Sequence, residues 1–232
     1  MNKNSTPQNI GIIMDGNRRF SKRLMMKPWK GYEYGAKKIE EILKWCREFK
    51  IKELTLYAFS IENFDRPKEE FDYLMNLFRE EFERLKNDKN IMKEGIRINF
   101  IGRINMFTGE IQEKMRAIIE KTKNNTKFVL NLAMAYGGRA EIVDATKKIA
   151  EAVKQGKLDI NNINESVFRK NIYLKNEPDL IIRTGGEKRI SGFLSWQGSD
   201  AILHWTDHLW PEFSKEDFRL AIEDYKRARK ED

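Results

Sequence analysis

The feature that most constrains this chain is a set of short apolar runs, each of which stops at a cluster of polar and glycine residues. The first run covers residues 10–14 and is followed by Asp-Gly-Asn at 15–17 and by Arg18 and Arg19. β-Branched apolar residues favour a buried strand, whereas Asp-Gly-Asn is typical of a turn. We therefore predict a buried strand whose carboxyl end carries an acid and two cations.

The spacing of apolar residues predicts strands that alternate with helices along the whole chain. Strands are expected at 10–14, 52–59, 96–101, 127–134, 179–183 and 201–205, and helices at 34–46, 69–87, 110–123, 140–155, 164–171 and 215–229. Because Pro28 interrupts the basic segment 22–30, a loop or broken helix is expected there. Alternation of this kind indicates right-handed crossovers and a parallel sheet. We predict an α/β fold: a single domain over residues 1–232 with a central, mostly parallel sheet of about six strands, surrounded by helices.

Composition excludes several classes of protein. Hydrophobic residues make up 40% of the chain and charged residues 34%, and no run of about 18 apolar residues is present, so we expect no membrane span. The polar segment 1–8 lacks the apolar centre of a signal peptide. A single cysteine, Cys46, forms no internal disulfide and fits a reducing compartment, and two histidines are too few for a zinc site. A cytoplasmic location is expected.

The net charge of +8 favours anionic binding partners but does not distinguish one class of anionic partner from another. Nucleic acid, an anionic membrane surface and a polyphosphate substrate would all be attracted by a positive charge. The same charge is also compatible with a lysine-rich protein that has no special partner. The sequence shows no RNA-binding signature, and its arginines follow buried strands instead of forming an exposed basic face. We therefore expect no nucleic-acid partner.

Four polar clusters follow predicted strands, at 15–19, 60–66, 136–139 and 183–191. Because the carboxyl ends of parallel strands share one edge of a sheet, these clusters should converge there. Asp15 suits a hard cation such as Mg²⁺, Arg18 and Arg19 suit phosphate oxygens, and Arg183 and Arg189 near Ser191 suit a second anion. A surface turn with solvated arginines explains the first cluster equally well. No Walker A motif, Rossmann fingerprint or nucleophile elbow is present.

Five blocks of sequence resemble the cis-prenyltransferases, the undecaprenyl diphosphate synthase family. They are Met-Asp-Gly-Asn-Arg-Arg at 14–19, Phe-Ser-Ile-Glu-Asn-Phe-Asp-Arg-Pro at 59–67, Tyr-Gly-Gly-Arg at 136–139, the segment 179–191, and Thr-Asp-His-Leu-Trp-Pro-Glu-Phe at 206–213. The resemblance runs from Ile10 to about Phe218. Blocks in this order are specific for the family and less specific for its product.

The resemblance implies a prenyltransferase that condenses isopentenyl diphosphate with an allylic prenyl diphosphate to give a cis-polyprenyl diphosphate. It implies Mg²⁺, bound by Asp15, and no redox cofactor. Asp15, Asn63 and Arg66 would be catalytic, and the substrates would be bound by Gly16, Asn17, Arg18, Arg19, Ser60, Phe64, Arg183, Arg189 and Ser191. The growing chain would lie in an apolar tunnel between sheet and helices, for which Phe71, Leu74, Met75 and Phe78 are candidate lining residues.

Several positions depart from the family pattern. Pro28 stands where a basic residue is usual, Tyr32 where histidine is usual, and Ile202 where homodimeric members carry a glutamate that contacts the metal. The chain also ends without the Arg-x-Gly tail that reaches across a dimer. Three interpretations stay open: an ordinary synthase, expected to be a homodimer; the catalytic subunit of a heteromer; and irregular prenyl coupling, either non-head-to-tail or to another acceptor. The basic segment 22–30 is a candidate flap over the diphosphates or a membrane-surface contact.

Overall fold

One six-stranded sheet forms the centre of the computed structural model, which describes residues 6–231. Its strands are β1 (Asn9–Ile13), β2 (Glu53–Ser60), β3 (Ile96–Ile101), β4 (Phe128–Tyr136), β5 (Leu180–Arg183) and β6 (Ile202–Trp205). Their order is β3-β4-β2-β1-β5-β6, and every neighbouring pair is parallel. The predicted parallel α/β architecture is confirmed.

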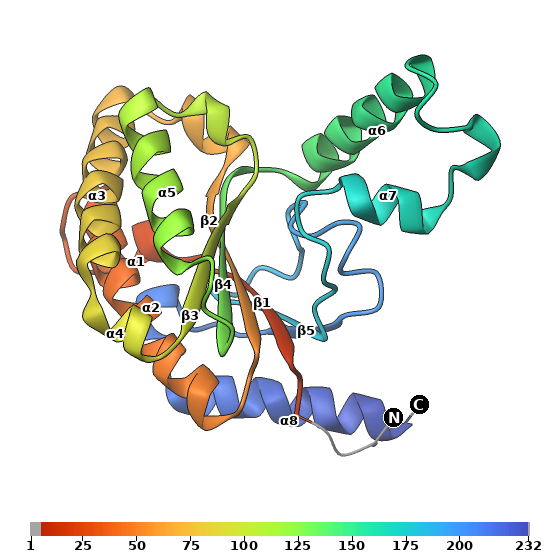
Figure 1. Cartoon of the computed structure of the whole chain (residues 1–232). Helices are drawn as coiled ribbons and strands as arrows, with labels where there is room; N and C mark the ends of the chain where they lie inside the picture. The colour runs from red at the N-terminus through yellow and green to blue at the C-terminus, as the bar shows by residue number, and fades with distance from the viewer. Residues whose placement is uncertain (1–5, 232) are drawn as a thin grey trace.

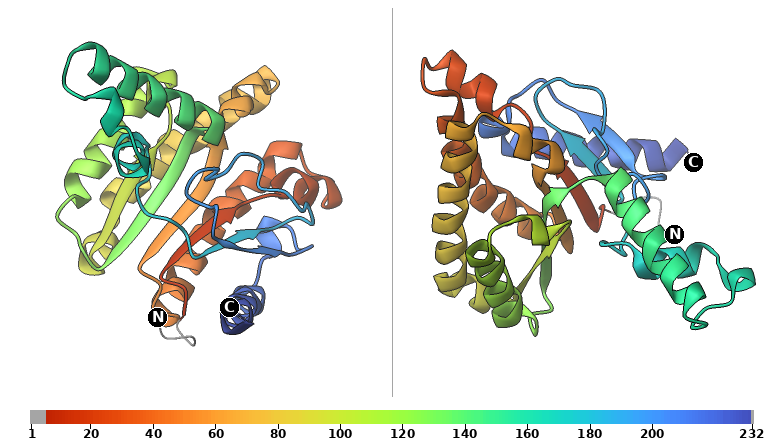
Figure 2. Two further views of the ribbon diagram at one scale, coloured as in Figure 1. Left: turned by 90° about the vertical axis from the view of Figure 1, so that its right-hand side faces the viewer. Right: turned by 90° about the horizontal axis from the view of Figure 1, so that it is seen from above.

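Helices cover both faces of this sheet. They are α1 (Asn17–Arg23), α2 (Gly31–Glu48), α3 (Lys68–Asn87), α4 (Lys89–Lys93), α5 (Gly109–Thr122), α6 (Gly138–Lys154), α7 (Glu165–Asn171) and α8 (Lys215–Glu231), with short 3₁₀ turns η1 (Pro28–Lys30), η2 (Ile61–Asp65), η3 (Ile104–Met106), η4 (Ile160–Asn162) and η5 (Trp210–Glu212). Figure 1 shows α2, α3 and α5 on one side of the sheet and α6 and α7 projecting on the other. The right-hand view of Figure 2 shows the same separation from above.

The main differences from the predicted elements lie around the first turn. The predicted turn is present at Gly16, with φ of 113°, and the chain enters α1 directly at Asn17, where no helix was predicted. Pro28 begins η1, which runs straight into α2, so that helix starts three residues earlier than predicted. The short helix α4 was not predicted, and β4 continues two residues further, to Tyr136.

The core lies on both sides of the sheet, as a fully covered parallel sheet requires. All residues of β1 and β5 are buried. Ile10 and Ile12 belong to the larger apolar cluster beneath α2, α3, α5 and α8, whereas Ile13 and Ile181 belong to a smaller cluster with Phe193 on the opposite face. In the described part of the chain, no helix is both long and apolar enough to cross a membrane.

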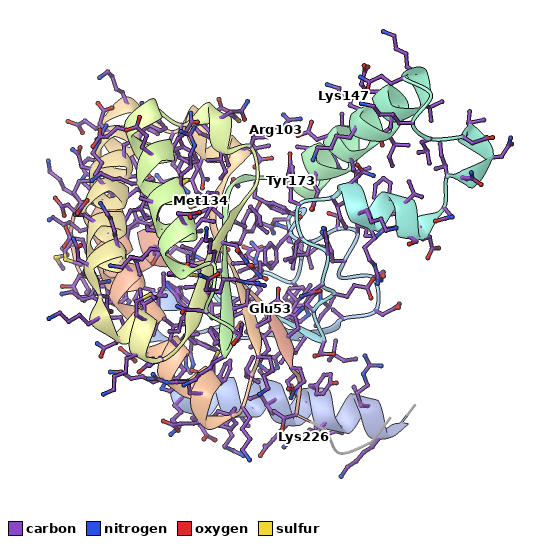
Figure 3. The ribbon with its side chains drawn as sticks, viewed as in Figure 1. Glu53, Arg103, Met134, Lys147, Tyr173 and Lys226 are labelled. Carbon is purple, nitrogen blue, oxygen red and sulfur yellow. The ribbon has the colours of Figure 1, made fainter. Side chains whose placement is uncertain are left out.

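An ion pair fixes α6 to the far end of β3. The Arg103 guanidinium donates to both carboxylate oxygens of Asp144, each at 2.9 Å, and the Tyr173 hydroxyl donates to the same carboxylate. Figure 3 labels Arg103 and Tyr173 on facing sides of this junction. The Arg103 guanidinium holds the pKa of Asp144 below its usual range. Charge pairing therefore contributes to the attachment of the projecting helices.

Candidate active site

Asp15 and Arg183 meet at the carboxyl edge of the sheet, where β1 and β5 end side by side. Arg183 Nη2 lies 2.9 Å from Asp15 Oδ2, and Arg19 Nη2 lies 3.2 Å from Asp15 Oδ1. Arg183 is buried and also donates to the Ser191 hydroxyl at 2.7 Å and to the Arg189 carbonyl oxygen. The first and fourth predicted clusters therefore converge, with one carboxylate between two guanidinium groups.

The backbone around Asp15 is held by segments distant in the sequence. Its carbonyl oxygen accepts hydrogen bonds from the Thr184 hydroxyl at 2.7 Å and from the Trp210 amide at 2.9 Å. Gly16 is in the left-handed region, and a Cβ there would stand 2.9 Å from Leu209. The turn after β1 is therefore fixed by the loops after β5 and β6, which orient the Asp15 side chain.

A second polar group surrounds Arg66, which lies between η2 and α3. Arg66 pairs with Glu70, whose buried carboxylate also accepts a hydrogen bond of 3.1 Å from the Tyr32 hydroxyl. Arg18 Nη2 stands 3.7 Å from the other oxygen of Glu70. Burial raises the pKa of Tyr32 to about 12, so its hydroxyl stays neutral at physiological pH. Tyr32, a departure from the family pattern, thus helps Glu70 to hold Arg66.

Glu70 was not identified from the sequence. A signal was available, because a glutamate four residues after Arg66 on a helix can pair with it. Such pairs are common on solvated helix faces, however, and only the tertiary structure shows that Glu70 is buried between α2 and α3.

Two adjoining cavities open at this edge. A polar basin of about 680 Å³ is lined by residues of the first turn and α1, among them Asp15, Gly16, Arg18 and Arg19. A second, elongated cavity of about 300 Å³ runs beneath α2 and α3. Both are bordered by Met14, Asn17, Tyr32 and Arg66. The basic basin therefore leads directly into the second cavity.

The second cavity is the predicted apolar tunnel. Its walls come from α2, α3 and strands β2, β3 and β4, including Ile39, Leu43, Leu74, Leu77, Phe78, Phe82, Leu85, Ile98, Leu130, Leu132 and Met134. Met134 is labelled in Figure 3. Of the four lining residues proposed from the sequence, Leu74 and Phe78 line it. Phe71 instead packs against Phe64, and Met75 belongs to the buried core.

The remaining predicted site residues are distributed unevenly. Asn63 borders the tunnel, and its Oδ1 accepts a hydrogen bond from the Ser60 amide at 3.1 Å, which closes the η2 turn. Ser60 and Phe64 border neither of the two cavities. The Phe64 ring packs edge-to-face against Phe59 and at a tilt against Phe107. The exposed Arg189 side chain pairs with Glu187 and reaches the site only through its carbonyl oxygen.

Buried polar atoms at the edge are unsatisfied. Among the described residues, Asn17 Oδ1, Arg66 Nε and Arg183 Nε are buried without a hydrogen-bond partner. Native structures contain few such atoms, and each calls for an explanation, of which a bound ligand, ion or water is one. The two guanidinium nitrogens can donate to a ligand rich in oxygen atoms, such as a diphosphate, whereas Asn17 Oδ1 can only accept a hydrogen bond.

The departure at Ile202 lies away from this edge. Ile202 pairs with Leu180, which in turn pairs with Ile10, at the amino ends of their strands. With about 3.3 Å per residue, that level is about 10 Å below the edge where β1 ends. A carboxylate at position 202 would therefore not stand beside Asp15 of the same chain.

Comparison with known proteins agrees with this geometry. The undecaprenyl diphosphate synthase family model matches residues 13–231. The tritrans,polycis-undecaprenyl-diphosphate synthase (geranylgeranyl-diphosphate specific) of Methanocaldococcus jannaschii is 44% identical over 99% of this chain and 84% of its own length. The Pyrococcus horikoshii protein of the same name is 46% identical over 95% of this chain and 84% of its own.

Solved structures show the same fold. Lavandulyl diphosphate synthase from Lavandula x intermedia, crystallised with dimethylallyl diphosphate, superposes with a TM-score of 0.88 at 30% identity, covering 95% of each chain. A probable undecaprenyl diphosphate synthase from Campylobacter jejuni gives a TM-score of 0.78 at 31% identity, also over 95% of each chain. The chain thus belongs to the undecaprenyl diphosphate synthase family of cis-prenyltransferases and is a prenyltransferase that makes prenyl diphosphates.

Proposed function

We propose that this chain extends geranylgeranyl diphosphate with isopentenyl diphosphate and so forms a long cis-polyprenyl diphosphate. The observation that carries the proposal is a basin of cations that opens directly into an apolar tunnel. A prenyl diphosphate has the same division, with an anionic head and an apolar tail. The primer is taken from the archaeal relatives, whose names specify geranylgeranyl diphosphate.

Asp15 is the residue that would hold Mg²⁺. The described residues contain no group of three or more histidine, cysteine, aspartate or glutamate side chains that could chelate a metal. A single carboxylate nevertheless fits Mg²⁺, which is commonly bound by one or two carboxylates together with substrate phosphates. The ion would supply positive charge where the leaving diphosphate becomes more negative.

The cations at this edge of the sheet would divide the two diphosphates between them: Arg18 and Arg19 line the basin, whereas Arg183 lies beside it, paired with Asp15. Arg18 and Arg19 are partly exposed and would close on the allylic diphosphate beside Asn17 and the turn at Gly16. Arg183 is already oriented by Ser191 and would, with Ser191 and Arg189, bind isopentenyl diphosphate. In the condensation a carbon–oxygen bond to diphosphate breaks, a carbon–carbon bond forms and one proton leaves. Fixed cations stabilise the departing charge without reorganising at that moment.

Asn63 and Arg66 would act where basin and tunnel meet. Both border the tunnel, and Arg66 is fixed there by Glu70 and Tyr32. The first carbon of the allylic substrate must lie at this junction if its diphosphate is in the basin and its tail is in the tunnel. We assign both residues to the neighbourhood of the reacting carbons, as the family resemblance predicts.

The test is incubation of the purified protein with radiolabelled isopentenyl diphosphate, Mg²⁺ and allylic primers of several lengths. A ladder of cis products that needs Mg²⁺, with geranylgeranyl diphosphate as the best primer, supports the proposal. A branched product or one formed by a single condensation would instead indicate irregular coupling. Activity only after addition of cell extract would indicate a heteromer, and no turnover under any condition would refute the assignment.

We further propose a homodimer, based on the projecting pair α6 and α7. Val143, Ile160 and Ile163 are exposed apolar residues on this projection, which a second copy would cover. Light scattering coupled to size-exclusion chromatography tests this, and a monomeric mass at micromolar concentration would refute it.

We propose a cytoplasmic enzyme that touches the membrane surface through the segment 22–30. Leu24 and Met25 are exposed there, between Lys22, which borders the basin, and Lys27. Apolar and basic side chains together suit an anionic lipid surface. Co-sedimentation with anionic but not with neutral vesicles is expected, and equal recovery with both would count against the contact.

A further inference from the structure

Four cations border the polar basin at the edge of the sheet. They are Arg18, Arg19 and Lys22 of α1, and Arg66, which lies between η2 and α3. The three arginines have roles in the proposed function, but Lys22 has none toward the substrate. Its surroundings differ from those of the arginines in a way that indicates such a role.

Each of the three arginines shares its charge with a carboxylate. The pairs are Arg19 with Asp15 at 3.2 Å, Arg66 with Glu70, and Arg18 with Glu70 at 3.7 Å. Among the described side chains, by contrast, no carboxylate lies within 4.0 Å of the Lys22 ammonium. An anionic ligand must compete with a carboxylate for each arginine, whereas it can bind the lysine without displacing a partner.

Lys22 lies in the part of the basin that is farther from the tunnel. Asn17 begins α1 and borders both cavities, whereas Lys22 borders the basin alone. The helix advances by about 7.5 Å between these two residues, at 1.5 Å per residue. Because residues three and four apart share a helix face, Lys22 lies on the same face as Arg18 and Arg19. These three cations therefore form a row that leads away from the junction of basin and tunnel.

The backbone that carries Lys22 is held in place, although its side chain is exposed. The Lys22 carbonyl oxygen accepts a hydrogen bond of 3.1 Å from the Met25 amide, and the buried Ser21 hydroxyl donates to the Asn17 carbonyl oxygen at 3.3 Å. The start of α2 packs so closely on α1 that no room is left for a Cβ at Gly31. A lysine ammonium has three donors on a flexible stem, so from this fixed base it can follow a phosphate group.

The other lysines of the segment 22–30 are directed elsewhere. Lys27 Nζ lies 5.3 Å from the ring centroid of Trp29, and Lys30 Nζ pairs with Glu33 at 2.8 Å. Neither Lys27 nor Lys30 is among the residues that border the basin. Of the lysines in this segment, Lys22 is therefore the one that can reach a ligand there.

We propose that Lys22 binds the terminal phosphate of the allylic substrate and so makes the basin selective for diphosphates over monophosphates. The phosphate that is attached to the prenyl carbon lies near the junction at Asn17, and the second phosphate extends along α1 toward Lys22. The inference rests on the proposed elongation activity. It also accounts for Pro28, which borders the basin without a charge, because α1 supplies the positive charge instead.

Isothermal titration calorimetry tests the assignment without turnover. Geranylgeranyl diphosphate and geranylgeranyl monophosphate are each titrated into the protein in the absence of isopentenyl diphosphate, so that no condensation can occur. Lys22→Gln should weaken diphosphate binding about tenfold and monophosphate binding less than about twofold, because only the second phosphate reaches position 22. Lys22→Arg keeps the charge and should bind the diphosphate within about threefold of the parent.

Lys37→Gln is the matched control. Lys37 is also an exposed lysine on a helix, α2, and it borders neither the basin nor the tunnel. The control lowers the net charge by the same amount and should leave both affinities unchanged. In the elongation assay, Lys22→Gln should raise KM for geranylgeranyl diphosphate about tenfold and leave KM for isopentenyl diphosphate unchanged.

Two results would overturn the role of Lys22 and leave the proposed function standing, provided that the parent elongates its primer. One is an unchanged diphosphate affinity in Lys22→Gln, and the other is an equal loss of affinity for the diphosphate and the monophosphate. Failure of the parent to elongate any allylic diphosphate would instead refute the proposed function.

Discussion

Gly35 allows the close approach of α2 to the turn that carries Asn17. A Cβ at position 35 would stand 2.4 Å from Asn17 Oδ1 and 2.9 Å from Trp210 Cδ1. Helix α2 cannot easily withdraw, because the buried Trp210 indole donates a hydrogen bond of 2.9 Å to the Gly35 carbonyl oxygen. Gly35→Ala should therefore displace the Asn17 amide from the junction of basin and tunnel.

The expected effects on stability and activity differ in size. Alanine is a better helix former than glycine by about 1 kcal/mol, and overpacking costs about 1–3 kcal/mol. The free energy of unfolding should fall by no more than about 2 kcal/mol as the net of these terms. A displacement of about 1 Å at a substrate-positioning group can cost a factor of about 100 in turnover. We expect an enzyme that stays folded and loses about 100-fold in kcat/KM.

The assay measures kcat/KM for isopentenyl diphosphate and urea unfolding of Gly35→Ala. Gly109→Ala is the matched control, because position 109 also lies in a helix and a Cβ there meets nothing within 4 Å. The control should keep parental activity and be slightly more stable. Activity of Gly35→Ala within about threefold of the parent would refute the reasoning, because ΔΔG‡ would then be below about 0.7 kcal/mol.

Two further changes probe the charges. Asp15→Ala should abolish turnover almost completely, by about 1,000-fold or more, while the far-ultraviolet circular dichroism stays unchanged; turnover within a few-fold of the parent would show the metal assignment to be wrong. Asp144→Asn should lower the free energy of unfolding at pH 7 by about 1–3 kcal/mol, because a charge-assisted pair with Arg103 is lost. Since the folded-state pKa of Asp144 is lowered, this stabilisation is complete above the unfolded-state pKa of about 3.9 and is lost as the pH falls through the folded-state pKa. Acid and urea titrations should show the two proteins converging below pH 4, and a constant difference would contradict the pairing.

The strands and the edge that carries the site were readable from local patterns. Runs such as 180–183 are apolar because both faces of a parallel sheet are covered, and that requirement acts on each strand separately. Parallel strands then place their carboxyl ends together. This is why Asp15 and Arg183, 168 residues apart, could be predicted to meet.

The rotation of each helix and the partners of each charge were decided only by the tertiary structure. Hydrophobic spacing along α3 does not distinguish Leu74, which lines the tunnel, from Met75, which packs in the core. Glu70 is indistinguishable in sequence from a solvated glutamate, yet it is buried against Tyr32. Arg84 reaches Glu40 only because α2 and α3 lie side by side. Local sequence determines the spacing of the apolar residues and therefore which segments form helices and which form strands. The shape of a cavity depends instead on how several elements pack against one another.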